Sequence, residues 1–257
     1  MKTHPISQLA NPARFLAVTR PVMPVLWVLT ALCLAAGTYM AFITSPPDFR
    51  QGESVRMMYV HVPAAWLALQ TYAAVAIASF VGFVWRHRLA DLAAREAAKI
   101  GLAFTVLALM TGSFWGKVTW GVYWDWDPRL TSMLVLMFIY VGYISIWQAV
   151  EGEARAARLA ALLAMLGAIN LPIIKFSVDW WDSLHQKATV IREGGPSMPA
   201  SMLWPLLLMG LGYFFLSIAY TILRTRTALV ERTVRQPESR APSRAQLEAI
   251  PEGGGHE

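Results

Sequence analysis

The sequence predicts an all-α membrane protein, a bundle of six transmembrane helices whose unusual residues lie in the outer loops. Three observations predict this class: 56% of the 257 residues are hydrophobic, only 15% are charged, and the apolar residues gather in long runs. A soluble domain of this length usually carries about 25% charged residues. The shortfall is therefore typical of a chain that faces lipid.

Six apolar segments approach the roughly 20 residues that a spanning helix needs. They are residues 22–43, 62–85, 100–114, 130–150, 159–176 and 202–223. The first is longer than a signal-peptide core, which has roughly 7–15 apolar residues, and no cleavage site follows it, so we expect it to remain as an anchor. Residues 1–223 are thus predicted to form one transmembrane domain.

An even number of spans places both termini on the same side of the membrane. That side carries about twice as many Lys and Arg residues as the other, and a smaller excess remains without the tail after Leu223. The positive-inside rule then makes both termini cytoplasmic. The tail, residues 224–257, is rich in Arg, Glu, Pro and Gly. We expect it to be mostly disordered beyond its first turns, and a solvated tail is favoured over a docking segment.

Charge and cysteine content argue against two classes of protein, nucleic-acid-binding proteins and c-type cytochromes. The net charge of +6 comes from basic residues that flank the apolar segments rather than forming one stripe, so membrane orientation explains it better than nucleic-acid binding. The lone cysteine, Cys33, can form no internal disulfide, and the chain has no C-x-x-C-H motif. The protein is therefore not itself a c-type cytochrome.

The middle outer loop, predicted over residues 115–129, holds an unusual concentration of tryptophan. Trp115, Trp120, Trp124 and Trp126 fall within it, with glycines at positions 116 and 121. Tryptophan is enriched at membrane interfaces, so an aromatic belt is the plain alternative. A belt explains one or two tryptophans at a helix end but not four in one loop. Indole rings offer broad, flat apolar contact, which predicts a platform for a flat aromatic cofactor, most simply haem.

Two charged residues follow this platform. Asp127 stands before Pro128 and an apolar run, which is the pattern of a helix N-cap with proline at the first helical position. Capping alone and a role in binding both remain open for Asp127. Arg129 lies near the same helix N-terminus, where a cation is unfavourable. An anion should therefore compensate Arg129, either Asp127 or a ligand carboxylate.

Of five histidines, only His61 and His185 fall in the outer segments. Each alone is best explained as an interfacial hydrogen-bonding histidine. Together, on separate segments at the same face as the tryptophans, they match two trans imidazoles that hold haem iron. The haem propionates would then need cations, and Arg56 and Arg129 are the candidates.

The segment Trp120-Gly121-Val122-Tyr123-Trp124-Asp125-Trp126-Asp127 fits the tryptophan-rich signature WGxxWxWD. With six spans and two outer histidines, the chain resembles the haem exporter C family (CcmC) of cytochrome c maturation over nearly all residues up to about Leu223. The resemblance implies that His61 and His185 are axial ligands of haem b (iron protoporphyrin IX). It also implies that Trp115, Trp120, Trp124, Trp126 and Asp127 form the platform and that Arg56 and Arg129 pair with propionates.

The resemblance further implies a place and partners. Such proteins lie in the bacterial inner membrane, with their haem-binding loops in the periplasm. They load haem onto the chaperone CcmE and act with the small membrane protein CcmD and the ABC transporter subunits CcmA and CcmB. This chain has no nucleotide-binding loop and no evident nucleophile–base pair on its outer face, so we expect a haem-transfer subunit rather than an enzyme. The rivals are a cytochrome c synthase subunit and a membrane subunit without cofactor.

Overall fold

The structure, a computed structural model, describes residues 11–187, 189–190 and 192–240. The described part contains helices and loops but no sheet. Its elements in order are α2 (Pro12–Tyr39), the π-helix η1 (Met40–Thr44), the 3-10 helix η2 (Glu53–Met57), α3 (Met58–Trp85), α4 (Arg88–Trp120), α5 (Pro128–Ala149), α6 (Glu153–Gly167), α7 (Asn170–Trp180) and α8 (Ala200–Arg240).

The predicted fold class is confirmed. Six helical segments are long and apolar enough to cross a membrane: Pro12–Thr44, Glu53–Trp85, Arg88–Trp120, Pro128–Ala149, Glu153–Trp180 and Ala200–Arg232. Each corresponds to one predicted segment, and most are longer than predicted, although Pro128–Ala149 ends one residue before the predicted segment 130–150. Large apolar side chains remain exposed along their flanks, Val28, Leu32, Ile77 and Leu166 among them. Lipid contact accounts for this exposure, because the bilayer core is as apolar as these side chains.

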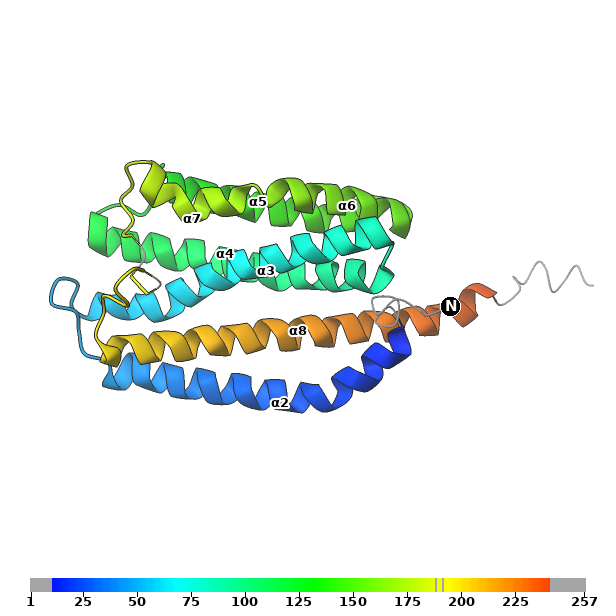
Figure 1. The fold of residues 1–257 in the computed structure, drawn as a ribbon, viewed down its shortest axis with the longest axis horizontal. Coiled ribbons are helices and arrows are strands. Elements are labelled where there is room, and N and C mark those ends of the chain that lie inside the picture. Colours follow the sequence, from blue (N-terminus) through cyan, green and yellow to red (C-terminus); the bar gives the residue numbers. More distant parts are fainter. Residues whose placement is uncertain (1–10, 188, 191, 241–257) are drawn as a thin grey trace, which may run out of the picture.

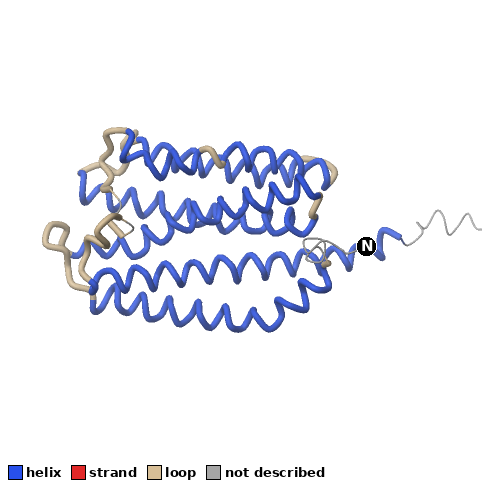
Figure 2. Tube along the Cα trace, in the orientation of Figure 1, coloured by secondary structure: helices blue, strands red, loops and turns tan. Residues whose placement is uncertain are grey.

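The spans alternate in direction and are stacked in successive layers, as Figure 1 shows. The pair α3 and α4 lies in the middle, α5, α6 and α7 cover one side of it, and α8 packs on the other side with α2 outermost. The helix α2 begins and α8 ends at one end of the bundle, here called the terminal end. The longer tan loops of Figure 2 gather at the opposite end, here called the loop end.

Buried tyrosines and glycines fix the middle of the bundle. Tyr72 and Tyr140 meet edge to face with ring centroids 5.0 Å apart. The hydroxyl of Tyr140 donates to Ala68 O at 2.9 Å. Gly101 on α4 makes room for it, because a Cβ there would lie 2.2 Å from the Tyr140 hydroxyl oxygen. Such close approaches hold α3, α4 and α5 in fixed register and so position the residues at the loop end.

The prediction that the middle loop starts at residue 115 is wrong, because α4 continues to Trp120 and ends at Gly121. Gly121 adopts a left-handed conformation (φ +82°), which is the usual helix C-cap. A helix of 33 residues is roughly 50 Å long, against a hydrocarbon core of about 30 Å. The helix α4 can therefore extend beyond the lipid and carry Trp115 and Trp120 on a rigid support rather than on a loop.

The fifth span is two helices, α6 and α7, rather than the continuous segment 159–176. Pro172 lies in the first turn of α7 and cannot donate to the carbonyl four residues earlier, which favours a break. Asn170 is buried at the break and donates from Nδ2 to Ser132 O of α5 at 2.8 Å. This hydrogen bond ties the start of α7 to the first turns of α5.

The last helix, α8, continues past Leu223 to Arg240, well into the predicted cytoplasmic tail. Two contacts support this extension at the terminal end. Arg226 donates to Leu16 O at 2.7 Å, and Arg232 forms an ion pair with Glu153. Residues 241–257, where most of the predicted disorder falls, lie outside the described residues.

Candidate haem-binding site

Residues from three loops and two helix ends meet at the loop end. The connections are residues 45–52, 121–127 and 181–199, and the helices are α3 and α4. His61 belongs to the first turn of α3 rather than to a loop, and His185 lies in the connection between α7 and α8. Each histidine is held by its Nδ1 atom and covered by a different tryptophan of α4.

His61 points from α3 toward α4. Its Nδ1 lies 2.9 Å from Ala108 O and 3.2 Å from Thr111 Oγ1. Because the carbonyl oxygen can only accept, Nδ1 must carry the proton and donate it. Gly112 leaves the space for this approach, since a Cβ there would lie 2.7 Å from His61 Cε1. In the neutral ring Nε2 is then the atom with a lone pair, free for a metal.

Trp115 covers one side of His61. The two rings meet edge to face, with centroids 5.8 Å apart and planes 70° apart. The indole Nε1 donates to Gln51 Oε1 at 2.9 Å, so its polar atom is satisfied by the connection of residues 45–52. The apolar body of the ring is left to pack against the imidazole.

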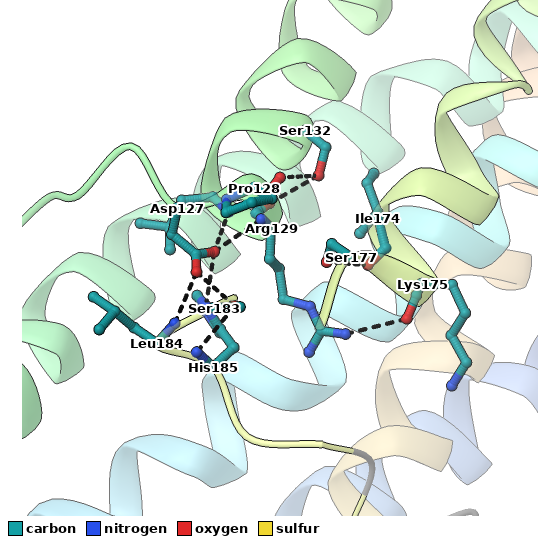
Figure 3. A network of polar contacts seen from close by, with 11 residues as sticks. Asp127, Pro128, Arg129, Ser132, Ile174, Lys175, Ser177, Ser183, Leu184 and His185 are labelled. Carbon is teal, nitrogen blue, oxygen red and sulfur yellow. Dashed lines mark hydrogen bonds and ion pairs between the residues drawn. The ribbon is translucent and has the colours of Figure 1, made fainter. Parts of the chain in front are cut away.

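Asp127 is the most heavily bonded residue of the site. It is 5% exposed and caps α5, accepting from the backbone N–H of Arg129 at 2.8 Å and of Leu130 at 3.3 Å. Its other oxygen accepts from Ser183 Oγ at 2.5 Å and from Leu184 N at 2.9 Å. Figure 3 shows this carboxylate between the start of α5 and the connection that carries His185. Asp127 therefore caps α5 and also holds the connection that carries His185. Its role in binding remains a prediction.

His185 completes this network. Its Nδ1 lies 3.2 Å from Asp127 Oδ1, and its ring meets Trp120 edge to face with centroids 4.9 Å apart. A carboxylate only accepts, so Nδ1 donates and Nε2 keeps the lone pair. This is the carboxylate–histidine arrangement that orients metal-binding imidazoles and makes them better ligands.

The charges in this network follow from burial. Burial alone would raise the pKa of Asp127, but the hydrogen bond from Ser183, the charge of His185 and two backbone N–H groups together hold it below its usual value. Burial lowers the pKa of His185, and this outweighs the opposite effect of Asp127. Asp127 is therefore ionised and His185 neutral near pH 7, which is the state that a metal ligand requires.

Arg129 extends from the first turn of α5 into the same region, beside the connection that holds His185 (Figure 3). One of its terminal nitrogens donates to Lys175 O at 3.3 Å, and its buried Nε has no hydrogen-bond partner among the described residues. A buried guanidinium N–H without a partner is costly. Arg129 is thus suited to pair with a carboxylate of a ligand.

Arg56 is placed differently. Its Nε donates to Glu53 Oε2 at 2.5 Å and a terminal nitrogen donates to Ala41 O at 2.7 Å. These two contacts already satisfy much of the guanidinium group. The expectation that Arg56 pairs with a propionate remains a prediction, and Arg129 is the better candidate.

Trp124 and Trp126 lie apart from the two histidine contacts. They pair with each other edge to face, with centroids 5.6 Å apart, and the side chain of Trp126 is 73% exposed. The structure therefore brings His61 together with Trp115, and His185 together with Trp120 and Asp127. Trp124 and Trp126 contact each other instead.

Sequence reasoning missed the residues that orient these groups: Gln51, Ala108, Thr111 and Ser183. Two of them act through a side-chain hydrogen bond across more than 50 positions of sequence, and Ala108 acts only through its backbone carbonyl. No local pattern marks such contacts, because they depend on how α3, α4 and the connections pack.

The donor set fits a tetrapyrrole better than a bare metal ion. No group of three or more His, Cys, Asp or Glu residues forms a metal site within residues 11–187, 189–190 and 192–240. The two imidazoles would offer two ligands, and the planar ring of a haem would supply the other four. Indole rings beside each imidazole and one cation without a full set of partners are further features that such a ligand would require.

Comparison with known proteins decides the family. The family model described as Heme exporter protein C matches residues 5–240. The chain belongs to the Heme exporter protein C family. Heme exporter protein C of Bradyrhizobium diazoefficiens is 50% identical over 236 residues, which are 92% of this chain and 89% of that protein. Heme exporter protein C of Escherichia coli K12 is 40% identical over 233 residues, covering 90% and 94% of the two chains.

The family also reaches beyond bacteria. A ccmC-like mitochondrial protein of Marchantia polymorpha is 45% identical over 204 residues, which are 79% of this chain and 85% of that protein. The expected membership in the Heme exporter protein C family is thus confirmed over nearly the whole chain.

Proposed function

We propose that this protein binds haem b at the loop end, with His61 and His185 as axial ligands, and delivers it to the chaperone CcmE in cytochrome c maturation. Membership in the Heme exporter protein C family supports a role in haem handling. The single observation that carries the proposal is the matched state of the two imidazoles. In each, Nδ1 donates to a fixed acceptor and Nε2 is left with its lone pair.

The two ligands differ in how firmly they are held. His61 stands on a transmembrane helix and hydrogen-bonds to the neighbouring helix, whereas His185 stands on a connection and depends on Asp127 and Ser183. A ligand on a connection can move away at lower cost than one on a packed helix. The His185 side is therefore where bound haem would be released to the chaperone.

Arg129 would pair with a haem propionate, since its buried Nε has no partner among the described residues. The pair Trp124 and Trp126, of which Trp126 is exposed, would cover the open edge of the porphyrin and present it to the acceptor. In this role the chain binds and transfers haem without catalysing a bond change of its own.

The proposed setting is the bacterial inner membrane, with the loop end in the periplasm and both termini in the cytoplasm. The excess of Lys and Arg around the terminal end supports this orientation. ATP-driven steps would then come from CcmA and CcmB, with CcmD as a small membrane partner, and lipid would surround the exposed apolar flanks.

The test uses the purified full-length protein in detergent or nanodiscs. We expect a Soret band after haem is added, and transfer of that haem to CcmE on mixing. A His87→Ala variant serves as the control, because His87 caps α4 at the terminal end. Direct attachment of haem to a CxxCH apocytochrome would instead indicate a synthase. The lack of a Soret band in the wild type would support a membrane subunit without cofactor and overturn the proposal.

A further inference from the structure

The connection of residues 45–52 contains a hydrogen-bonded turn. Asp48 and Gly52 exchange two backbone hydrogen bonds, at 3.1 and 2.8 Å. The side chain of Asp48 accepts from the backbone N–H of Arg50 at 2.8 Å and of Gln51 at 2.9 Å. Gly52 has a φ of +58°, which suits glycine. The backbone of Gln51 is thus fixed by its neighbours, independently of its side chain.

Two further contacts anchor this turn to the bundle. The hydroxyls of Ser45 and Tyr59 hydrogen-bond to each other, and the Tyr59 side chain is fully buried. Val55 is also buried, in a cluster with residues of α8. The position of the turn therefore does not depend on the side chain of Gln51.

The side chain of Gln51 reaches across to α4. Its Oε1 accepts from Trp115 Nε1 at 2.9 Å, and Trp115 in turn meets His61 edge to face. An indole N–H can only donate, and in a partly buried setting it needs an acceptor. Within the described chain Gln51 is the acceptor that this indole has, so it sets the rotation of the ring.

We infer that Gln51 is a positioning residue for the axial ligand His61, acting through the indole ring of Trp115. This inference rests on the proposed haem-binding function and deepens it. The Nδ1 hydrogen bond to Ala108 O fixes one edge of the imidazole, but a ring held at one edge can still tilt. The indole edge restrains that tilt, and Gln51 restrains the indole. Together they keep Nε2 aimed at one point, as an axial ligand must be.

The key variant is Gln51→Leu, which keeps the size of the side chain but removes the acceptor. We expect the apparent Kd for haem to rise about threefold to tenfold, in the range that one neutral hydrogen bond accounts for. The high-spin fraction of the ferric protein should also rise, because His61 ligates less completely. Gln51→Glu keeps an acceptor for the indole N–H and should restore both values to within about twofold of the wild type.

Two further variants separate positioning from a general loss of structure. Gln70→Leu is the matched control, since Gln70 is an exposed glutamine farther along α3; it should leave the spectrum unchanged. Trp115→Phe removes the donor. If Gln51 acts through Trp115, adding Gln51→Leu to Trp115→Phe should cause no further change in Kd or spin state. Gln51→Met, which has only a weak acceptor, takes the place of Gln51→Leu if that variant does not fold.

The outcomes distinguish the two claims. A wild type without a Soret band overturns the proposed function and this inference with it. A wild type that binds haem, together with a Gln51→Leu variant of the same Kd and spin state, overturns the inference alone. Effects of Gln51→Leu and Trp115→Phe that add fully in the double variant also overturn it, because Gln51 would then act by another route.

Discussion

The carboxylate of Asp127 connects three parts of the site: the first turn of α5, the connection that carries Ser183, and the ring of His185. A single oxygen atom could not serve all of them, but the two oxygens of an ionised carboxylate can accept four or more hydrogen bonds. The residue therefore needs its charge as well as its shape. Replacement by asparagine separates the two.

We predict that Asp127→Asn weakens haem binding by roughly tenfold or more, because the amide places an N–H group where one of the donors must be accepted and removes the charge that orients His185. The measurement is a haem titration followed at the Soret band. An Asp125→Asn variant is the control, since Asp125 is exposed. Equal affinity of Asp127→Asn and the wild type would contradict this account.

The same carboxylate predicts a pH dependence of stability. The pKa of Asp127 is lower in the folded protein than its usual value. Its contribution is therefore fully present above pH about 4 and is lost as the pH falls through the lowered folded value. The melting temperature of the wild type should exceed that of Asp127→Asn at pH 6 and approach it as the pH falls below the lowered pKa of the folded protein. A constant difference across this range would show that the charge of Asp127 does not stabilise the fold.

At the scale of helices, the sequence predicts the six spans well but their ends poorly. Apolar runs mark where lipid surrounds a helix, whereas α4 continues for several residues beyond its run and α8 continues to Arg240. Helix ends outside the lipid depend on caps such as Gly121 and on tertiary contacts such as the ion pair between Arg232 and Glu153. The break between α6 and α7 has a local signal in Pro172, which a hydropathy pattern does not detect.

For the candidate site, too, the sequence predicts one part and not the other: it predicts the residues but not their orientation. The tryptophans stand out in the sequence by their concentration in one short segment and Asp127 by its place before Pro128. The two histidines stand out because they fall in the predicted outer segments. Their orientation cannot be predicted, because it comes from partners such as Ala108 O and Gln51, which become neighbours only once α3 and α4 pack together.

Packing between helices gives a third prediction. Gly101→Ala should lower the melting temperature strongly or prevent folding, since the added Cβ would lie 2.2 Å from the hydroxyl oxygen of the buried Tyr140. Tyr140 cannot withdraw without losing its hydrogen bond to Ala68 O. Gly142→Ala is the matched control, because its Cβ would meet only a leucine methyl group at 3.3 Å. Thermal unfolding in detergent measures the melting temperatures of the two variants. Equal melting temperatures of Gly101→Ala and Gly142→Ala would contradict the packing argument.

For the whole molecule, a common site requires that the three connections at the loop end, residues 45–52, 121–127 and 181–199, lie in one compartment. The antiparallel bundle places them at one end, opposite the start of α2 and the end of α8. We predict that cysteines introduced by Asp125→Cys and Gln186→Cys, with Cys33 replaced by serine, react with an impermeant maleimide added to spheroplasts. A cysteine introduced by Glu151→Cys, in the exposed turn between α5 and α6, should not react. Labelling of all three introduced cysteines, or of the cysteine from Glu151→Cys alone, would contradict the predicted orientation.

The most direct test of the central claim is electron paramagnetic resonance of the ferric, haem-loaded protein. We predict a low-spin signal typical of two imidazole ligands in the wild type. The His61→Gly and His185→Gly variants should each become mainly high-spin, and added imidazole should return each to low spin by filling the space that the side chain left. A low-spin signal that persists unchanged in either variant would contradict axial ligation by that histidine.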